Sequence, residues 1–157
     1  MVDHFNFILL HVWMLFISAL IALLVAISAW RHREVTGGRM LLFAMLAITV
    51  WAFFAALEAA AIPQNLKILF SKLEYIGLIN SPAAFFVFML LYTHQVRRLG
   101  GRLILVVWII PVITLIIAFT NDLHGWLWSG YQPGPVEANV LIYEHGPWFW
   151  VFTLHTY

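Results

Sequence analysis

Four ionisable side chains lie close together in the sequence, near a point where two long apolar runs meet. Glu58 comes just before Pro63, and Lys67, Lys72 and Glu74 follow that proline. Charged groups beside apolar runs are costly to bury, so they are either paired or part of a functional site. Two interpretations stay open: a structural ion pair of Glu58 with Lys67 or Lys72 across the turn, or the polar floor of a ligand pocket.

The pocket interpretation adds aromatic and imidazole side chains. Trp51 lies about two helical turns before Glu58 and would form an aromatic wall of the pocket. The candidate ligand-binding residues are Trp51, Glu58, Lys72, Glu74, Tyr75, His124 and Trp126. Aromatic residues are also dense around positions 126–150, where they could form a belt at a membrane surface or a lid over an apolar or amphiphilic ligand. They are Trp126, Trp128, Tyr131, Tyr143, Trp148, Phe149 and Trp150.

Histidines are the other group that could carry chemistry. His11 and His155 are expected at similar depth on two helices, as axial haem ligation would require, although paired or solvated histidines explain them equally. The chain has no cysteine, which excludes disulfides, thiolate metal sites and cysteine catalysis. No nucleophile elbow, phosphate-binding glycine loop or zinc spacing is present. We therefore expect no enzymatic activity and no cofactor.

The composition identifies the environment in which these residues act. Of 157 residues, 64% are hydrophobic and only 10% are charged. A soluble domain has roughly 45–50% apolar and about 25% charged residues, and a chain of this length could not bury the excess. The composition excludes a soluble enzyme and a typical nucleic-acid-binding protein. It predicts an all-α integral membrane protein whose helices contact the lipid bilayer.

Apolar runs divide the chain into a polytopic helix bundle. We expect four complete spans at about 5–30, 40–62, 66–94 and 103–119, and an incomplete fifth at 147–157, which is too short to cross a bilayer. All belong to one transmembrane domain, 1–157, and the short last helix favours a chain truncated in its fifth span. Residues 120–146 would form a short external loop or hairpin. Within the spans, Pro82 predicts a kink at Leu78, and Asn80 predicts a hydrogen bond between helices.

The basic residues predict the orientation of the bundle. Six of the eight Lys and Arg residues lie in the first and third loops: Arg31, Arg33, Arg39, Arg97, Arg98 and Arg102. These loops lie on one side of the membrane, and the positive-inside rule makes that side cytoplasmic. The protein is then a multi-pass protein of the cell membrane, with the N-terminus and the 120–146 segment on the extracytoplasmic side.

Several short segments, taken in order, suggest a family. They are WAFFAALE at 51–58, KLEYIG at 72–77, SPAAFFVF at 81–88, YT at 92–93, IP at 110–111, TNDLH at 120–124 and GPWFW at 146–150. Each is weak alone, but from about residue 30 onward the set resembles the N-terminal seven-transmembrane sensor region of bacterial and archaeal sensor histidine kinases and some diguanylate cyclases.

The resemblance implies a sensory input module. Such a module would bind an unknown extracytoplasmic or membrane-borne ligand, small or lipid-like, and pass a helix rearrangement to cytoplasmic output domains, with a homodimer expected in the full-length receptor. Pro82 and Pro111 would serve as bend points in that rearrangement. Two alternatives from other classes stay open: an accessory subunit of a larger membrane complex, and a haem- or quinone-binding membrane protein.

Overall fold

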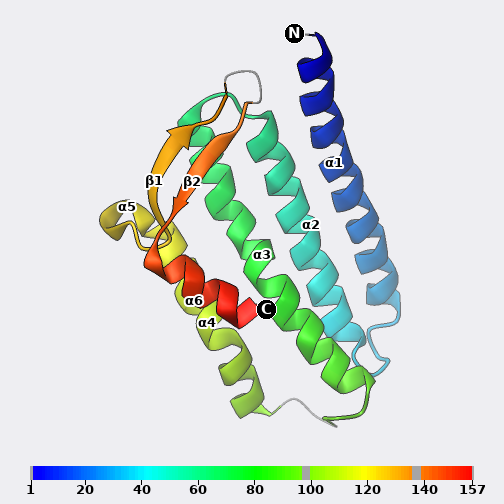
Figure 1. Ribbon diagram of the computed structural model, residues 1–157. Coiled ribbons are helices and arrows are strands. Elements are labelled where there is room, and N and C mark those ends of the chain that lie inside the picture. The colour runs from blue at the N-terminus through cyan, green and yellow to red at the C-terminus, as the bar shows by residue number, and fades with distance from the viewer. Residues whose placement is uncertain (1, 97–99, 136–138, 157) are drawn as a thin grey trace.

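A computed structural model describes residues 2–96, 100–135 and 139–156, with side chains from Leu9 onward (Figure 1). Four long helices and a small cap region make up these residues. The elements are α1 (Val2–Arg31), α2 (Gly38–Ala60), α3 (Gln64–Tyr92), α4 (Gly101–Phe119), α5 (Asn121–His124), β1 (Trp128–Pro133), β2 (Leu141–His145) and α6 (Pro147–Thr156). The helices α2, α3 and α4, and α1 from Leu9, are each long and apolar enough to cross a membrane. The fold is therefore the predicted helical membrane type.

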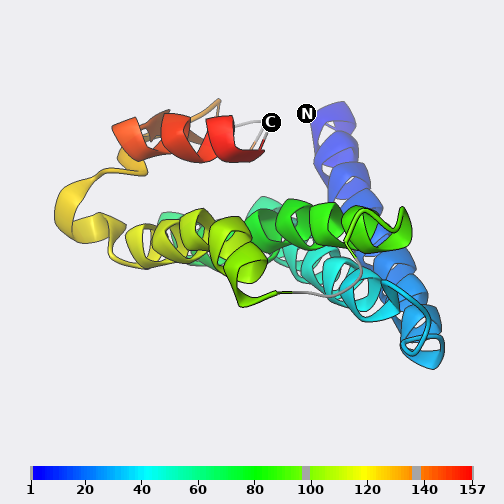
Figure 2. The same cartoon turned by 90° about the horizontal axis from the view of Figure 1, so that it is seen from below.

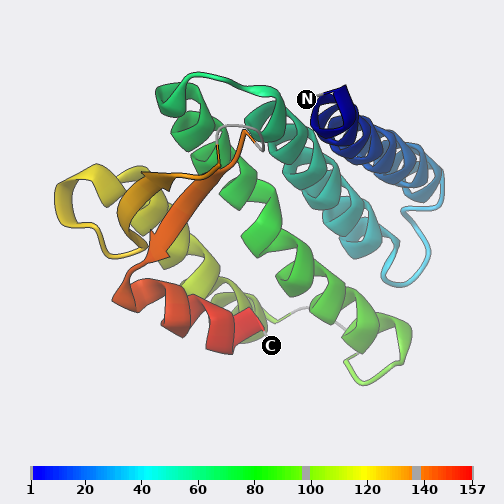
Figure 3. The ribbon, with the colours of Figure 1, turned by 45° about the horizontal axis from the view of Figure 1, so that its top comes forward.

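Small side chains bring α1, α2 and α3 together. The residues of α1 that are buried include Ala19, Ala22, Ala26 and Ala29, which recur at helical spacing. On α2 every buried residue is glycine or alanine. Small residues let helix backbones approach closely in lipid, where van der Waals packing replaces the hydrophobic effect between helices. This sequence feature explains why the three helices form a single flat layer (Figure 3).

Gly77 is the tightest contact of that layer. A Cβ atom at this position would lie 2.2 Å from the carbonyl oxygen of Ala47 and 2.4 Å from the backbone nitrogen of Trp51. No side chain fits there without moving α2 away from α3. Gly77 therefore fixes the distance between these two helices.

The predicted proline site in α3 is present, with its freed carbonyl satisfied. Pro82 lies inside the helix and cannot donate to Leu78, but the Ser81 hydroxyl donates to the Leu78 carbonyl at 3.2 Å. Two residues earlier, Asn80 accepts a hydrogen bond from the indole nitrogen of Trp108 on α4 at 3.0 Å. Asn80 thus joins α3 to α4, as a polar residue within a span is expected to do.

Beyond α4 the chain forms the cap, which lies on one face of the bundle against α3 and α4 (Figure 2). The strands β1 and β2 pair antiparallel, with Tyr131 opposite Tyr143. Their hairpin runs along α3 toward the α2–α3 turn, and α6 then returns beside α4 (Figures 1 and 2). The cap and the bundle share one core, made of Tyr75, Ile79, Ile117, Ala118, Leu127, Trp128 and Phe152. The cap therefore packs directly against the spanning helices.

Candidate functional site

The C-terminus of α2 is where the cap meets the bundle. A helix leaves its last carbonyl groups without partners inside the helix. Here Lys67 donates to the Glu58 carbonyl at 2.9 Å, and the Asn139 amide donates to the carbonyls of Ala59 and Ala61, each at 3.1 Å. Lys67 also donates to the Asn139 carbonyl at 2.7 Å and is only 4% exposed. A cation at the negative end of a helix dipole is favourable, so Lys67 and Asn139 together complete this helix end.

The Glu58 side chain has a different partner from the one the sequence suggested. Its carboxylate accepts a hydrogen bond from the Tyr143 hydroxyl at 3.2 Å. The expected ion pair of Glu58 with Lys67 or Lys72 is wrong for the described residues, because Lys67 is occupied by backbone carbonyls and Lys72 by another carboxylate. Tyr143 on β2 thus connects the hairpin to α2.

Trp51 and Glu74 bridge α2 and α3. The Trp51 indole nitrogen donates to the Glu74 carboxylate at 2.9 Å. This bond lies one helical turn from Gly77, where the two helices are in closest contact. Two of the candidate residues, Trp51 and Glu74, are therefore in contact. Their hydrogen bond holds α2 to α3 and uses polar atoms that a ligand would need.

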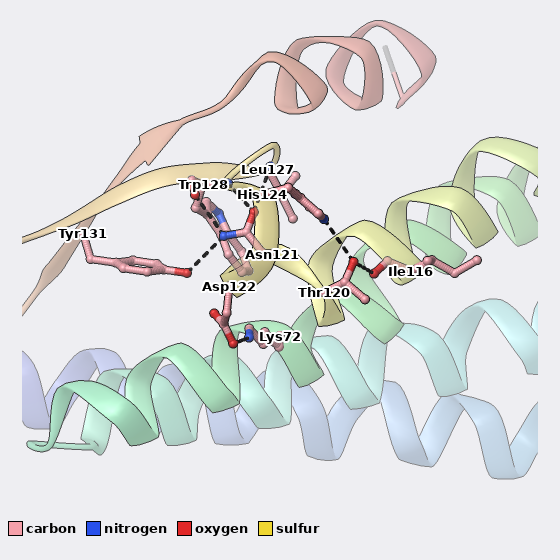
Figure 4. A network of polar contacts seen from close by, with 9 residues as sticks. All are labelled: Lys72, Ile116, Thr120, Asn121, Asp122, His124, Leu127, Trp128 and Tyr131. Carbon is pink, nitrogen blue, oxygen red and sulfur yellow. Dashed lines mark hydrogen bonds and ion pairs between the residues drawn. The ribbon is translucent and has the colours of Figure 1, made fainter.

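Lys72 forms an ion pair with Asp122 on α5. The Nζ atom lies 2.6 Å from Oδ2, and the Lys72 side chain is 10% exposed while that of Asp122 is 67% exposed (Figure 4). The buried partner is thus on a spanning helix, and the hydrated partner is on the cap. This ion pair therefore links α5 to the third turn of α3.

Asn121 organises the turn between α5 and β1. Its side-chain oxygen accepts from the backbone nitrogens of Leu127 at 2.9 Å and Trp128 at 3.0 Å, and its amide donates to the Trp128 carbonyl at 2.9 Å (Figure 4). The amide also lies 3.3 Å from the Tyr131 hydroxyl. Asn121 is 3% exposed, so these bonds form in a dry environment where an unmade hydrogen bond is costly. This residue fixes the position of its neighbour Asp122.

His124 and Trp126 lie next to each other at the edge of the cap. The imidazole of His124 makes hydrogen bonds to the Thr120 hydroxyl and to the Trp126 backbone nitrogen, both at 3.0 Å. Trp126 is 52% exposed, and its ring centroid lies 5.0 Å from that of His124. His124 is therefore a structural residue of the turn that is accessible on one side, and Trp126 lies at the surface.

The seven cap aromatics divide into two sets. Trp128 is buried against Tyr75, with ring centroids 5.1 Å apart, and Tyr131, Tyr143, Trp148 and Phe149 pack around this core. Trp126 and Trp150 are instead exposed. The cap aromatics thus mainly form a core, and Trp126 and Trp150 are the two whose side chains are largely exposed.

A hollow of about 360 Å³ lies between α5 and β1. Its wall includes Asp122, His124, Trp128, Gly130 and Tyr131. A carboxylate, an imidazole and a phenol thus converge beside an aromatic ring, at a volume within the ~300–1,000 Å³ range of small-molecule sites. A second cavity of about 390 Å³ is mostly apolar and lies between α3, α4 and α6, where Pro82, Phe86, Val107 and His155 line it.

The two tyrosines of the hairpin are held in their neutral form. Burial raises the pKa of Tyr143 well above its usual range, and the nearby negative charge of Glu58 raises it further. Burial also raises the pKa of Tyr131, a rise that its bond to Asn121 opposes. Both hydroxyls therefore stay protonated, and that of Tyr143 remains the donor to Glu58.

The predicted ligand-binding residues do not form one site. Trp51, Glu58 and Glu74 make their bonds at the α2–α3 side. Lys72 of α3 instead pairs with α5, the helix that carries His124, and Tyr75 packs against Trp128. His11 and His155 are on helices at opposite flanks of the bundle, so one copy of the chain does not bring them together (Figure 3). The structure adds Asp122, Asn121, Asn139 and Tyr143 to the candidate site. The sequence signal for Asn121 and Asn139 was asparagine in a turn region, because its side chain readily bonds to backbone groups. In the structure Asn139 has a positive φ of 48°.

A comparison with known protein families identifies the chain. The family described as the N-terminal 7TM region of histidine kinase matches residues 14–157. No curated protein and no solved structure matches the chain. The family match covers most of the first candidate span, the other three candidate spans and the cap. The protein belongs to the family of N-terminal seven-transmembrane regions of histidine kinases, the non-catalytic input part of sensor kinases.

Proposed function

We propose that this input region detects a small polar or amphiphilic molecule in the hollow between α5 and β1. The proposal depends on the position of Asp122, which lines the hollow and also forms the ion pair with Lys72 on α3. A molecule that hydrogen-bonds to Asp122 would compete with that pair. Ligand entry would then change a direct contact between the cap and a spanning helix.

The cap lies outside the cell in this proposal. Among the described residues, the α1–α2 loop carries Arg33 and Arg39 lies in the first turn of α2, while Arg102 lies in the first turn of α4 at the same end of the bundle (Figure 1). The positive-inside rule supports a cytoplasmic position for that end. The N-terminus, the hairpin and the hollow are then extracytoplasmic. Four complete spans cross the membrane, and α6 is the start of a fifth.

Signal transmission would proceed by a shift between two packings of the helices. Ligand binding needs only a different affinity for the two packings to change their populations. The hairpin contacts α2 through Tyr143 and Asn139, and α6 contacts α4 through a bond from the Trp148 indole to the Thr114 hydroxyl at 3.0 Å. Pro82 and Pro111 are the bend points that would let α3 and α4 follow the cap. The output domains and a homodimeric receptor belong to the same proposal.

The proposal is tested in a full-length sensor histidine kinase that carries this input region, by measuring autophosphorylation in membranes. Asp122→Asn, Lys72→Ala and Glu58→Gln should each change the basal rate several-fold, because each alters a contact between the cap and a spanning helix. Ile62→Ser is the matched control, since Ile62 is 83% exposed at the same end of the bundle.

Binding is tested separately on the purified chain. Small amines and carboxylic acids are screened for an increase in the thermal unfolding temperature, and the effect of any active compound should be lost in Asp122→Asn and kept in Ile62→Ser. Equal stabilisation of both variants would place the binding site elsewhere. Unchanged basal autophosphorylation in all three variants would contradict the transmission step.

A further inference from the structure

An exposed apolar stripe on α4 continues past the end of that helix. It consists of Leu105, Ile109, Val112, Ile116, Phe119 and Leu123, spaced by four, three, four, three and four residues, and is here named the lipid-facing stripe. This spacing places the first five on one face of α4, and Leu123 follows on α5 after the turn at Thr120. The last member belongs to α5 and is the most exposed, at 84%, and the exposed Trp126 follows three residues later.

The depth of α5 places this extension at the surface of the bilayer. The 19 residues of α4 span about 28 Å at 1.5 Å per residue, close to the ~30 Å thickness of the hydrocarbon. α5 begins two residues after α4 ends, so Leu123 and Trp126 lie where the hydrocarbon meets the headgroups. Tryptophan is enriched at that level because its ring is apolar and its N–H is polar.

The other side of α5 contacts the protein. Asp122 is adjacent to Leu123 in the sequence, but its carboxylate points to Lys72 of α3 (Figure 4). Asn121 holds α5 to β1 through three short bonds. A movement of α5 with the lipid would therefore be carried to α3 and to the hairpin.

We propose that α5 and the start of the following loop contact the lipid of the leaflet at the cap end, and that the depth of this contact acts on α3 through Asp122 and Lys72. The partner is the interfacial region of a phosphatidylcholine-like bilayer. Continuity with the lipid-facing stripe of a spanning helix supports lipid over a second copy of the chain. The inference shares the Asp122–Lys72 pair with the proposed function, but it does not require a ligand in the hollow.

The absence of cysteine from the chain makes a labelling test direct. Leu123→Cys and Ile62→Cys are each labelled with a nitroxide, and the chain is placed in dioleoylphosphatidylcholine vesicles. The two positions are matched, since both are apolar and are 84% and 83% exposed. Ile62 lies in the turn before α3, whose 29 residues extend about 43 Å and therefore reach beyond the hydrocarbon.

Collision rates with oxygen and with a water-soluble nickel chelate then report the surroundings of each label. We expect oxygen to dominate at 123 and the nickel chelate to dominate at 62, with Trp126→Cys behaving like 123. Nickel accessibility at 123 equal to that at 62 would overturn the proposal. Protection of 123 from both reagents would also overturn it, because it would show that a second copy of the chain covers α5.

Coupling to α3 needs a second measurement. A nitroxide pair at 123 and at Leu69, a half-exposed residue of α3, gives the distance between the two helices. The distribution should be narrow in both short-chain and long-chain phosphatidylcholine, and Asp122→Asn should broaden it. An unchanged distribution in Asp122→Asn would remove the step from α5 to α3.

Discussion

The Tyr143 hydroxyl donates a hydrogen bond to the Glu58 carboxylate across 85 positions of the sequence. This bond joins the second strand of the hairpin to the end of α2. With Lys67 and Asn139, it makes the α2–α3 turn part of the cap. The cap is thus joined to the spanning helices by specific polar bonds in addition to the apolar core that they share.

Removing this hydroxyl should loosen the hairpin without unfolding the spans. Tyr143→Phe is expected to cost about 1–2 kcal/mol, as is typical of a hydrogen bond to a charged group. Protease cleavage of the hairpin in native conditions measures the local opening. Tyr92→Phe is the control, since Tyr92 is 64% exposed at the opposite end of α3. Equal cleavage rates in native protein and Tyr143→Phe would show that the bond contributes nothing.

Asn121→Ala should have the largest effect among the cap residues. It removes one acceptor and one donor from a buried turn and leaves the backbone groups of Leu127 and Trp128 without partners. We expect a loss of about 3 kcal/mol, since each unmade buried bond costs ~1–3 kcal/mol. Thermal unfolding in detergent micelles, followed by near-ultraviolet circular dichroism of the cap tryptophans, measures it. A loss smaller than that of Tyr143→Phe would contradict this assignment.

The two partners of the Lys72–Asp122 pair should not be equivalent. Asp122→Asn leaves an ammonium in a side chain that is 10% exposed, whereas Lys72→Met leaves a carboxylate that is 67% exposed and can be hydrated. The first change should cost about 2 kcal/mol and the second under about 1 kcal/mol, because only the first leaves a buried charge without a partner. Unfolding temperatures of the two variants make the comparison, and the reverse order would disprove the explanation.

Gly77→Ala should separate α2 from α3. The added Cβ would overlap the backbone of Ala47 and Trp51, and overpacking of this kind costs about 1–3 kcal/mol or more. Gly101→Ala is the matched control, because it also lies in a helix and no atom lies within 4 Å of its added Cβ. The unfolding temperature should fall in the first variant and stay the same or rise in the second.

Alkaline pH should weaken the hairpin only above about pH 10. Burial raises the folded-state pKa of Tyr143 and Tyr131 above the ordinary value of 10.0. The stabilisation from the neutral phenols is therefore fully present below that pH and is lost as the pH rises through the folded-state pKa values. Absorbance at 295 nm should show these two tyrosines ionising above pH 10, and this phase should shrink in Tyr143→Phe. Ionisation of both near pH 10 would contradict the burial argument.

The spanning helices were readable from the sequence because lipid imposes a simple rule. Every apolar run of about 20 residues must be a helix, and Pro82 and Asn80 act locally, within or between adjacent helices. The turn residues near 120–146 likewise indicated a hairpin, and β1 and β2 form one. These features depend on neighbouring residues or on the solvent alone.

The partners of the polar residues were not readable in the same way. Lys72 is closer in sequence to Glu58 than to Asp122, and the sequence therefore favoured the wrong carboxylate. Its true partner depends on where α4 ends and how α5 turns, which the buried bonds of Asn121 determine. A single sequence does not report such contacts between segments that lie 50 positions apart.

The contact at Gly77 has a mechanical consequence for any receptor built on this region. With the Ala47 and Trp51 backbones against Gly77 and the Trp51 indole bonded to Glu74, α2 and α3 cannot slide past each other without breaking both contacts. They therefore move as one unit when the cap acts on α3. Relative motion must then occur between this pair and α1, α4 or α6, which border it, and probes of signalling belong across those boundaries.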